Sequence, residues 1–589
     1  MSHSPREHEA QNSRPLRSIG RIVTRVRVLS CLGGMLTGPA SGAYHATEGS
    51  PSGSGFNSNL PLLIIEVAGP WIPDHPRIPA SLSIIGTSNG CSSLTGTIER
   101  AERIAISSRG NSSRVYAKQP YRFEIQDERG ADRKVPLLGL PPGSDWILYA
   151  SVIDRTFIRD ALAYELWRQM GHYAPRTRYV EVFIRTNSPP ATNGVPGHDA
   201  VAGTTTAAEP TTGKRDGKPT DRGFYADQDS RFTLLTTNDY AGVYVLVEKI
   251  KRSKHRLDIA RMETWDTDGL EVTGGYILRK DRIKAGDQGF VTRQGIPLIY
   301  DEPKARATVP AQESWLTNFV NEFEGVLMSG QFRDPTNGYA KYIDAASFVD
   351  YHWIVEMSQG SDSFWVSQYF HKDRGGKLEA GPIWDWDLSF GNALFEMTNS
   401  IAGWRWAGID GKDYKWYGRL FEDPDFLQRY IDRWSELRKT VFATSNVLAQ
   451  VDRLASEVNE AQARNYARWH TLKKPLLGVS GVLRTYDEHV KWLKDWITAR
   501  LAWIDTQDFP PPVVSMLEAP PGGARMVALS CQVGRIFYVL DGSDPRMPGG
   551  QVARGALEYQ SPIHLDGKKL LTARVRSDYG LWSAPATQR

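Results

Sequence analysis

From about residue 60 to residue 250, the chain consists mainly of short apolar runs separated by polar turns. The first of them, residues 60–67, is an almost unbroken apolar run of strand length. Comparable runs follow at 81–85, 104–107, 121–125, 178–184 and 242–250. We therefore predict that this part of the chain is rich in β-strands.

Apolar residues spaced three and four apart predict helices elsewhere. Residues 156–170 place Phe157, Leu162 and Leu166 on one helix face, and Gly171 supplies a stop signal. Beyond residue 310 this helical spacing dominates. Further helices are predicted after the cap Asp423-Pro424, over 446–469, and from a capping box at Thr485 and Glu488.

The C-terminal part returns to short alternating strands. Residues 510–512 are three consecutive prolines, and a turn follows at 541–545. This pattern predicts a small all-β, Ig-like sandwich over 513–589. With the strand-rich and helix-rich segments before it, the chain is predicted to be an α+β protein with a main domain at 59–509.

Two segments are predicted to lie outside the folded body. In residues 1–58, arginines precede a short apolar patch, Val28-Leu29-Ser30-Cys31, and then small residues. That order is typical of an export signal, with possible lipidation at Cys31, although a disordered basic tail remains the alternative. An insertion at about 187–223 is rich in Thr, Pro, Gly and Ala, so we predict disorder there. A secreted or cell-surface protein is expected.

Composition excludes several classes of protein. The 589 residues include 71 basic and 67 acidic side chains, and a net charge of +4 is too small to indicate nucleic-acid binding. No run of eighteen apolar residues predicts a transmembrane segment. Three cysteines without paired spacing predict neither a disulfide framework nor a zinc site.

The candidate catalytic residues are two aspartates separated by a predicted hairpin. Asp362 follows Ser361, and Asp385 lies 23 positions later in the segment Trp384-Asp385-Trp386-Asp387. Phosphoryl transfer requires one carboxylate to orient the acceptor hydroxyl and another to hold the metal that bridges the phosphates. The spacing therefore suggests Asp362 as the catalytic residue and Asp385 as the metal ligand.

Upstream residues occur in the order of a nucleotide site. A polar turn at 109–113 could lie over phosphates, and Lys118 precedes a predicted strand, with Glu165 as its expected partner. A strand ending at Glu248 and Lys249 could meet adenine through its backbone. The predicted nucleotide-binding residues are Arg109, Asn111, Ser112, Ser113, Lys118, Glu248 and Lys249.

Each motif also has a simpler interpretation. The aspartates could cap a turn or bind a structural cation, the polar turn could be an ordinary one, and Lys118 could be a solvated charge. Two other functions stay open on the residues alone: a non-catalytic surface or adhesion protein, and a carbohydrate-active hydrolase, which would also use paired carboxylates.

The chain resembles the CotH kinase family, atypical kinases first known from spore coats. The resemblance covers about residues 60–508 and rests on 109–114, 118–122, 137–141, 145–146, 154–155, 180–183, 242–249, 274–277 and 381–387. It implies a two-lobed, kinase-like fold and a protein kinase that uses ATP and Mg²⁺ or Mn²⁺ to phosphorylate Ser or Thr. It also implies Asp387 as a second acid at the metal site. Ser361, Ser367 and Arg279 depart from the residues common in that family.

A second resemblance concerns residues 513–589, which are similar to the C-terminal β-sandwich module found beside chitobiases and hexosaminidases. The match is carried by 536–546, 572–575 and Trp582-Ser583. It implies an accessory, non-catalytic module with possible carbohydrate or cell-surface contacts.

Overall fold

The computed structural model describes residues 55–186, 235–304, 307–394, 398–476, 478–507, 509–517, 525–565 and 569–589. The predicted insertion at 187–223 and nearly all of the predicted tail, with Cys31, lie outside these ranges. Among the residues that are described, none of the helices is both long and apolar enough to cross a membrane.

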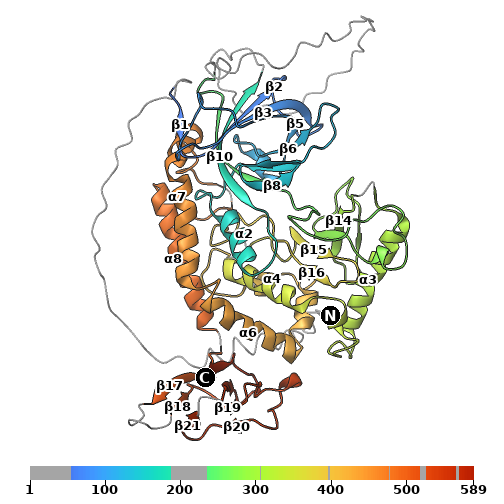
Figure 1. Ribbon diagram of the computed structural model, residues 1–589, viewed down its shortest axis with the longest axis vertical. Helices are drawn as coiled ribbons and strands as arrows, with labels where there is room; N and C mark the ends of the chain where they lie inside the picture. Colours follow the sequence, from blue (N-terminus) through green and yellow to red (C-terminus); the bar gives the residue numbers. More distant parts are fainter. Residues whose placement is uncertain are drawn as a thin grey trace, which may run out of the picture.

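The predicted N-terminal strands close into a barrel (Figure 1). Its strands follow the order β10-β11-β9-β6-β5-β3-β2, and closure is made by β2 and β10, which pair in parallel, with Glu181 opposite Leu62. The strands are β2 (Leu62–Val67), β3 (Ile78–Ile85), β5 (Arg100–Ser108), β6 (Tyr121–Gln126), β9 (Asp145–Tyr149), β10 (Thr177–Thr186) and β11 (Tyr240–Glu248). Small additional pairs are β1 (Asn57–Ser58) with β4 (Ser92–Ser93) and β7 (Val135–Leu137) with β8 (Leu140–Gly143).

The apolar run of β2 is buried on both faces, which explains its lack of alternation. Leu63 and Ile65 belong to one buried cluster with Leu82 and Ile104, while Leu62 and Ile64 pack in another. Since successive strand side chains point to opposite faces, both faces of β2 are covered by protein.

The long helix α7 (Thr444–Trp469) packs along the outside of the barrel. The Asn465 Oδ1 accepts a hydrogen bond from the Val243 backbone N–H at 3.1 Å, and the Trp469 indole donates to the Ala241 carbonyl at 2.9 Å. Gly242 between them has φ +99°, and a Cβ there would stand 2.5 Å from Asn465 Oδ1. Glycine is therefore required for this close approach.

A second sheet and several helices accompany the barrel. The sheet has the order β13-β14-β12-β15-β16. Its strands are β12 (Tyr276–Lys280), β13 (Gly289–Val291), β14 (Pro297–Glu302), β15 (Gln368–Lys372) and β16 (Leu378–Ala380). The helices are α2 (Arg159–Gln169), α3 (Pro310–Met328), α4 (Ala345–Ser358), α5 (Lys415–Leu420), α6 (Pro424–Lys439) and α8 (Tyr486–Asp505).

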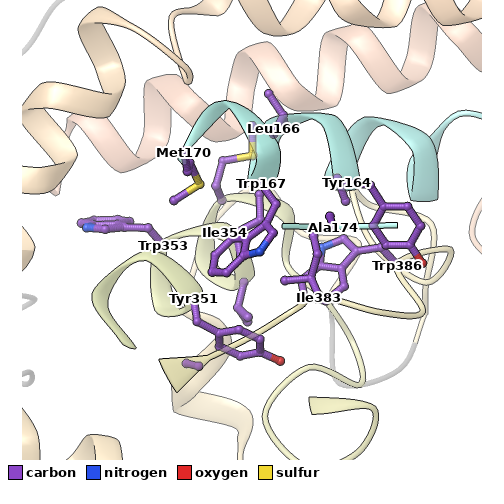
Figure 2. Close-up of a cluster of buried hydrophobic side chains, with 14 of the residues drawn as sticks. Tyr164, Leu166, Trp167, Met170, Ala174, Tyr351, Trp353, Ile354, Ile383 and Trp386 are labelled. Atoms are coloured by element: carbon purple, nitrogen blue, oxygen red, sulfur yellow. The ribbon is translucent and has the colours of Figure 1, made fainter. Parts of the chain in front are cut away.

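The largest buried apolar cluster joins α2 to the other helices and to the second sheet. Figure 2 shows Trp167 of α2 pointing towards Ile354 and Tyr351 of α4, with Tyr164 of α2 beside Trp386 from the loop after β16. Trp167 and Tyr351 pack edge to face at 6.2 Å between ring centroids. Helix α2 therefore packs directly against the segment that carries the candidate aspartates.

Two helix starts predicted from sequence, after Asp423 and after Thr485, are confirmed. The Asp423 carboxylate accepts the Asp425 N–H at 3.0 Å at the start of α6, and the Thr485 hydroxyl accepts the Glu488 N–H at 3.2 Å at the start of α8. These caps satisfy backbone donors that have no partner inside the helix.

Two small sheets form the C-terminal part. One has the order β17-β18-β21 and the other β20-β19-β22-β23, and they share an apolar core. The strands are β17 (Val513–Leu517), β18 (Arg525–Ser530), β19 (Arg535–Val539), β20 (Leu557–Glu558), β21 (Ile563–Leu565), β22 (Leu571–Arg576) and β23 (Ala586–Gln588). The mixed helix and sheet content confirms the α+β class.

Candidate active site

Backbone hydrogen bonds hold the two candidate loops side by side. Helix α4 ends at Ser358, and the chain then turns through Gln359, whose φ is +53°, towards Asp362. The Ser361 N–H donates to the Leu388 carbonyl at 3.0 Å, and the Phe390 N–H donates to the Ser358 carbonyl at 2.6 Å. The loop that contains Asp362 is thus paired with the loop that follows Asp385.

Helix α2 fixes the loop at Asp385 through two successive backbone groups. The Trp386 N–H donates to Asp160 Oδ1 at 2.6 Å, and the Asp385 N–H points at the Tyr164 hydroxyl oxygen at 3.3 Å. The Trp386 indole also donates to the Ser358 hydroxyl at 2.9 Å. Asp385 itself has φ +67°, a left-handed conformation that costs a non-glycine residue roughly 1–2 kcal/mol. These contacts keep it in that conformation.

The site contains four acidic side chains, Asp160, Asp362, Asp385 and Asp387, whose pKa values are all raised. Burial, followed by the charge of Asp385, raises the pKa of Asp362 to about 7. Burial and then Asp385 raise the pKa of Asp160 to about 7 as well. Burial raises the pKa of Asp385, and burial with the charges of Asp385 and Asp160 raises the pKa of Asp387 well above its usual range. Such mutual repulsion marks a place that favours added positive charge.

Two arginines partly offset this negative charge. The Arg109 guanidinium lowers the pKa of Asp385, opposing the effect of burial, and lies 5.6 Å from the Trp384 ring. Arg405 acts on the other loop, where it donates to the Gly360 carbonyl at 3.0 Å and the Ser361 carbonyl at 2.6 Å. Arg405 therefore holds the backbone that leads into Asp362.

The predicted polar turn lies beside these loops. Arg109 and Gly110 precede a short 3-10 helix, Ser112–Val115. Gly110 has φ +97°, and a Cβ on it would lie 2.0 Å from the Ser113 hydroxyl, so the turn requires glycine here. The Asn111 side-chain oxygen accepts a hydrogen bond from Lys284 at 3.0 Å. The turn is thereby connected to the loop after β12, a strand of the second sheet.

Lys118 is placed differently from the prediction. Its side chain is buried, with the residue 3% exposed, and its ammonium donates to the Ala150 and Val243 carbonyls and to Asn465 Oδ1. The expected pair with Glu165 is wrong, because Glu165 pairs with Arg168 at 2.7 Å. An ammonium has three N–H donors, and all three are used here. Lys118 in this structure thus ties α7 to the barrel and has no donor left for a phosphate.

The two residues predicted to meet adenine lie at the end of β11. Glu248 is fully buried and pairs with Arg176 at 3.0 Å and Arg256 at 3.1 Å, so its side chain has a structural role. Burial and then the charge of Lys304 lower the pKa of Lys249 to about 8. Their backbone contact with a nucleotide stays a prediction.

The donor set at Asp385 suits a hard cation. Within the described residues, no group of three or more His, Cys, Asp or Glu side chains is arranged to hold a metal ion. Mg²⁺, however, is usually bound by only one or two carboxylates, together with substrate phosphates. Asp385 Oδ2 lies 3.5 Å from the Ser367 hydroxyl, and Asp387 accepts a hydrogen bond from Tyr149. The oxygen chemistry and the crowded carboxyl groups fit such an ion.

Several residues of this site were not found by sequence reasoning. They are Asp160, Tyr164, Tyr149 and Arg405, which hold the loops or the acidic side chains through contacts distant in sequence. Asp160 did give a signal, since it is an acid beside the apolar face of a predicted helix.

Comparison with known proteins agrees with this geometry. The family model described as CotH kinase protein matches residues 106–504, a span that contains the polar turn, helix α2 and both aspartate loops. No match was found among curated proteins. Because the family model covers more than half of the chain, the chain belongs to the CotH kinase family.

Proposed function

We propose that this protein transfers the γ-phosphoryl group of ATP to a Ser or Thr hydroxyl of an extracellular or surface protein, with a divalent metal ion. The observation that carries this proposal is the pairing of the two loops, which brings Asp362 within electrostatic reach of Asp385 in a buried setting. A kinase site needs one acid at the acceptor and another at the phosphates.

Asp362 is the proposed catalytic residue. Its pKa of about 7 lies near neutral pH, where a carboxylate can accept a proton most effectively in the transition state. In the proposed reaction the acceptor oxygen forms a bond to the γ-phosphorus, the bond from that phosphorus to the bridging oxygen of ADP breaks, and the hydroxyl proton passes to Asp362. Arg405 fixes the backbone before Asp362 and so positions its side chain.

Asp385 and Asp387 are the proposed ligands of Mg²⁺ or Mn²⁺, because their oxygens are the donors that these ions prefer. When bound, the ion would neutralise charge on the phosphates of ATP. Arg109, already close enough to lower the pKa of Asp385, and the turn from Asn111 to Ser113 would bind the phosphate oxygens. The backbone at Glu248 and Lys249 would meet adenine. Lys118 has no part in this proposal.

The C-terminal sheets have a separate proposed role. Their resemblance to the module beside chitobiases supports an accessory function, such as contact with carbohydrate or a cell surface. The export-like N-terminus supports a secreted or surface location for the whole protein, with Cys31 as a possible lipid attachment point.

The direct test is labelling with γ-³²P-ATP in the presence of Mg²⁺ or Mn²⁺. Wild type is expected to label itself or a Ser-rich substrate, and Asp362→Ala is expected to reduce labelling by about 100-fold or more, the usual contribution of a general base. Asp452→Ala is the matched control, since this aspartate on α7 is 58% exposed and pairs with Lys494 on α8. Equal labelling by both variants, or no ATP binding by wild type, would favour the non-catalytic surface protein.

A further inference from the structure

A cavity lined by arginines lies on a different part of α2 from the aspartate loops. Its volume is about 370 Å³, and it is bounded by α2, the start of β10 and α7. The charged residues that line it are Glu165, Arg168, Arg176, Arg178, Arg453 and Glu457. None of these residues takes part in the proposed phosphoryl transfer, so the cavity calls for a separate explanation.

The cavity carries an excess of positive charge. Glu165 pairs with Arg168 at 2.7 Å, and Glu457 pairs with Arg453 at 2.7 Å. Each glutamate therefore offsets one arginine. The remaining two arginines differ: Arg176 shares the buried Glu248 with Arg256, while Arg178 forms no ion pair with any described residue. Two net positive charges remain, which matches the charge of a dianion.

Hydrogen-bond donors are also left over. Arg178 uses Nε for the Leu138 carbonyl at 3.1 Å and Nη1 for the Thr177 carbonyl at 2.8 Å. Arg453 uses Nε for Gln450 Oε1 at 3.1 Å and Nη1 for Glu457 at 2.7 Å. Within the described ranges, Nη2 of both arginines has no hydrogen-bond acceptor. A guanidinium presents five donors in a planar fork that fits phosphate oxygens, so these free groups suit a tetrahedral anion.

We propose that this cavity binds a phosphate dianion, either inorganic phosphate or a phosphate monoester on a small molecule or a side chain. The two sources share the same tetrahedral, doubly charged group. The walls supply fixed positions for its ligands, because Arg168 is held by the Pro175 carbonyl at 2.8 Å and Arg176 by the His255 carbonyl at 2.9 Å.

The site has a structural connection to the aspartate loops. Helix α2 lines the cavity with Glu165 and Arg168, and one turn earlier it holds the Asp385 loop with Asp160 and Tyr164. Binding that alters the Glu165–Arg168 pair would therefore act on the helix that positions Asp385. A change in transfer rate rests on the proposed function, whereas the binding itself does not.

Isothermal titration calorimetry with inorganic phosphate and with O-phospho-L-serine, in EDTA, tests the binding. The double variant Arg178→Gln/Arg453→Gln is expected to raise the Kd about ten-fold or more, since two charge-assisted contacts are lost. Glu457→Gln is expected to lower the Kd several fold, because a carboxylate that repels the anion is removed. The control Arg484→Gln removes the same charge from a side chain that is 87% exposed and outside the cavity, and its Kd should equal that of wild type.

Comparison of the two probes distinguishes the two sources of the phosphate group. A lower Kd for O-phospho-L-serine would support a phosphorylated side chain or metabolite as the ligand, and equal values would support free phosphate. The proposal is overturned if wild type binds neither probe at 10 mM, or if the double arginine variant binds as wild type does while circular dichroism shows that it is folded. Neither result depends on kinase activity, so failure here is distinct from failure of the proposed reaction.

Discussion

Buried charged groups have opposite surroundings in two regions of this protein: the contact between the C-terminal sheets and α6, and the aspartate loops. Where the C-terminal sheets meet α6, Arg574 is 4% exposed and lies between Asp432 at 2.6 Å and Asp544 at 2.7 Å. Nearby, Arg546 pairs with Asp425 at 2.6 Å. Between the aspartate loops, by contrast, the pKa values of the carboxyl groups are raised by burial and by the charges of their neighbours.

The difference separates a structural use of charge from a functional one. At the contact with α6, each of these charges is paired with an opposite charge elsewhere in the chain. Between the loops, burial and the neighbouring carboxyl groups make ionisation unfavourable. The proposed divalent ion would offset that cost.

The largest effect is expected from removing one charge in the aspartate loops. Asp385→Asn keeps the shape of the side chain and its backbone contacts, but weakens the proposed metal site. We expect a loss of about 1000-fold in phosphoryl transfer, which is about 4 kcal/mol of transition-state stabilisation. The melting temperature should stay the same or rise, because the neighbouring carboxyl groups lose a repelling charge. Labelling with γ-³²P-ATP and thermal unfolding measure the two effects.

A fall in both activity and melting temperature would contradict this prediction. It would mean that Asp385 stabilises the loop, and that the contrast with the α6 contact is wrong.

A smaller effect, confined to stability, is expected at the contact with α6. Arg574→Met leaves Asp432 and Asp544 without their shared cation. Because both carboxylates are partly exposed, we expect the free energy of unfolding of this region to fall by about 2 kcal/mol, less than for a fully buried pair. Urea unfolding measures this change in the free energy of unfolding. Arg535→Met, which breaks an exposed pair with Glu558, should cost under about 1 kcal/mol, and transfer activity should be unchanged in both.

The smallest effect is a difference in pH dependence. Burial keeps Asp362 protonated up to about pH 7 in the folded protein, whereas an unfolded aspartate loses its proton near pH 4. Between these values the folded state binds more protons, so the free energy of unfolding decreases as pH rises. In EDTA, Asp362→Asn should make the free energy of unfolding fall less steeply between pH 4.5 and 7.5. Denaturant titrations at several pH values measure it, and identical slopes for wild type and variant would contradict it.

Local patterns in the sequence were sufficient for much of the fold. Residues 60–67 and the later apolar runs correspond to barrel strands, and the caps at Asp423 and Thr485 begin helices where predicted. These features depend on neighbouring residues, so periodicity and capping rules recover them. The spacing of Asp362 and Asp385 likewise identified two loops that the folded chain pairs.

The direction of individual side chains depended on the tertiary structure. Lys118 was expected to face phosphates, but Asn465, far away in sequence, takes its ammonium together with two backbone carbonyls. Asp160 was not expected in the site, yet it accepts the Trp386 N–H across 226 residues. The parallel pairing of β2 with β10 that closes the barrel is equally distant. The sequence by itself determined which elements form and which residues could do chemistry. Which of those residues meet was decided by long-range packing, because a buried polar group must find its partner wherever the folded chain places one.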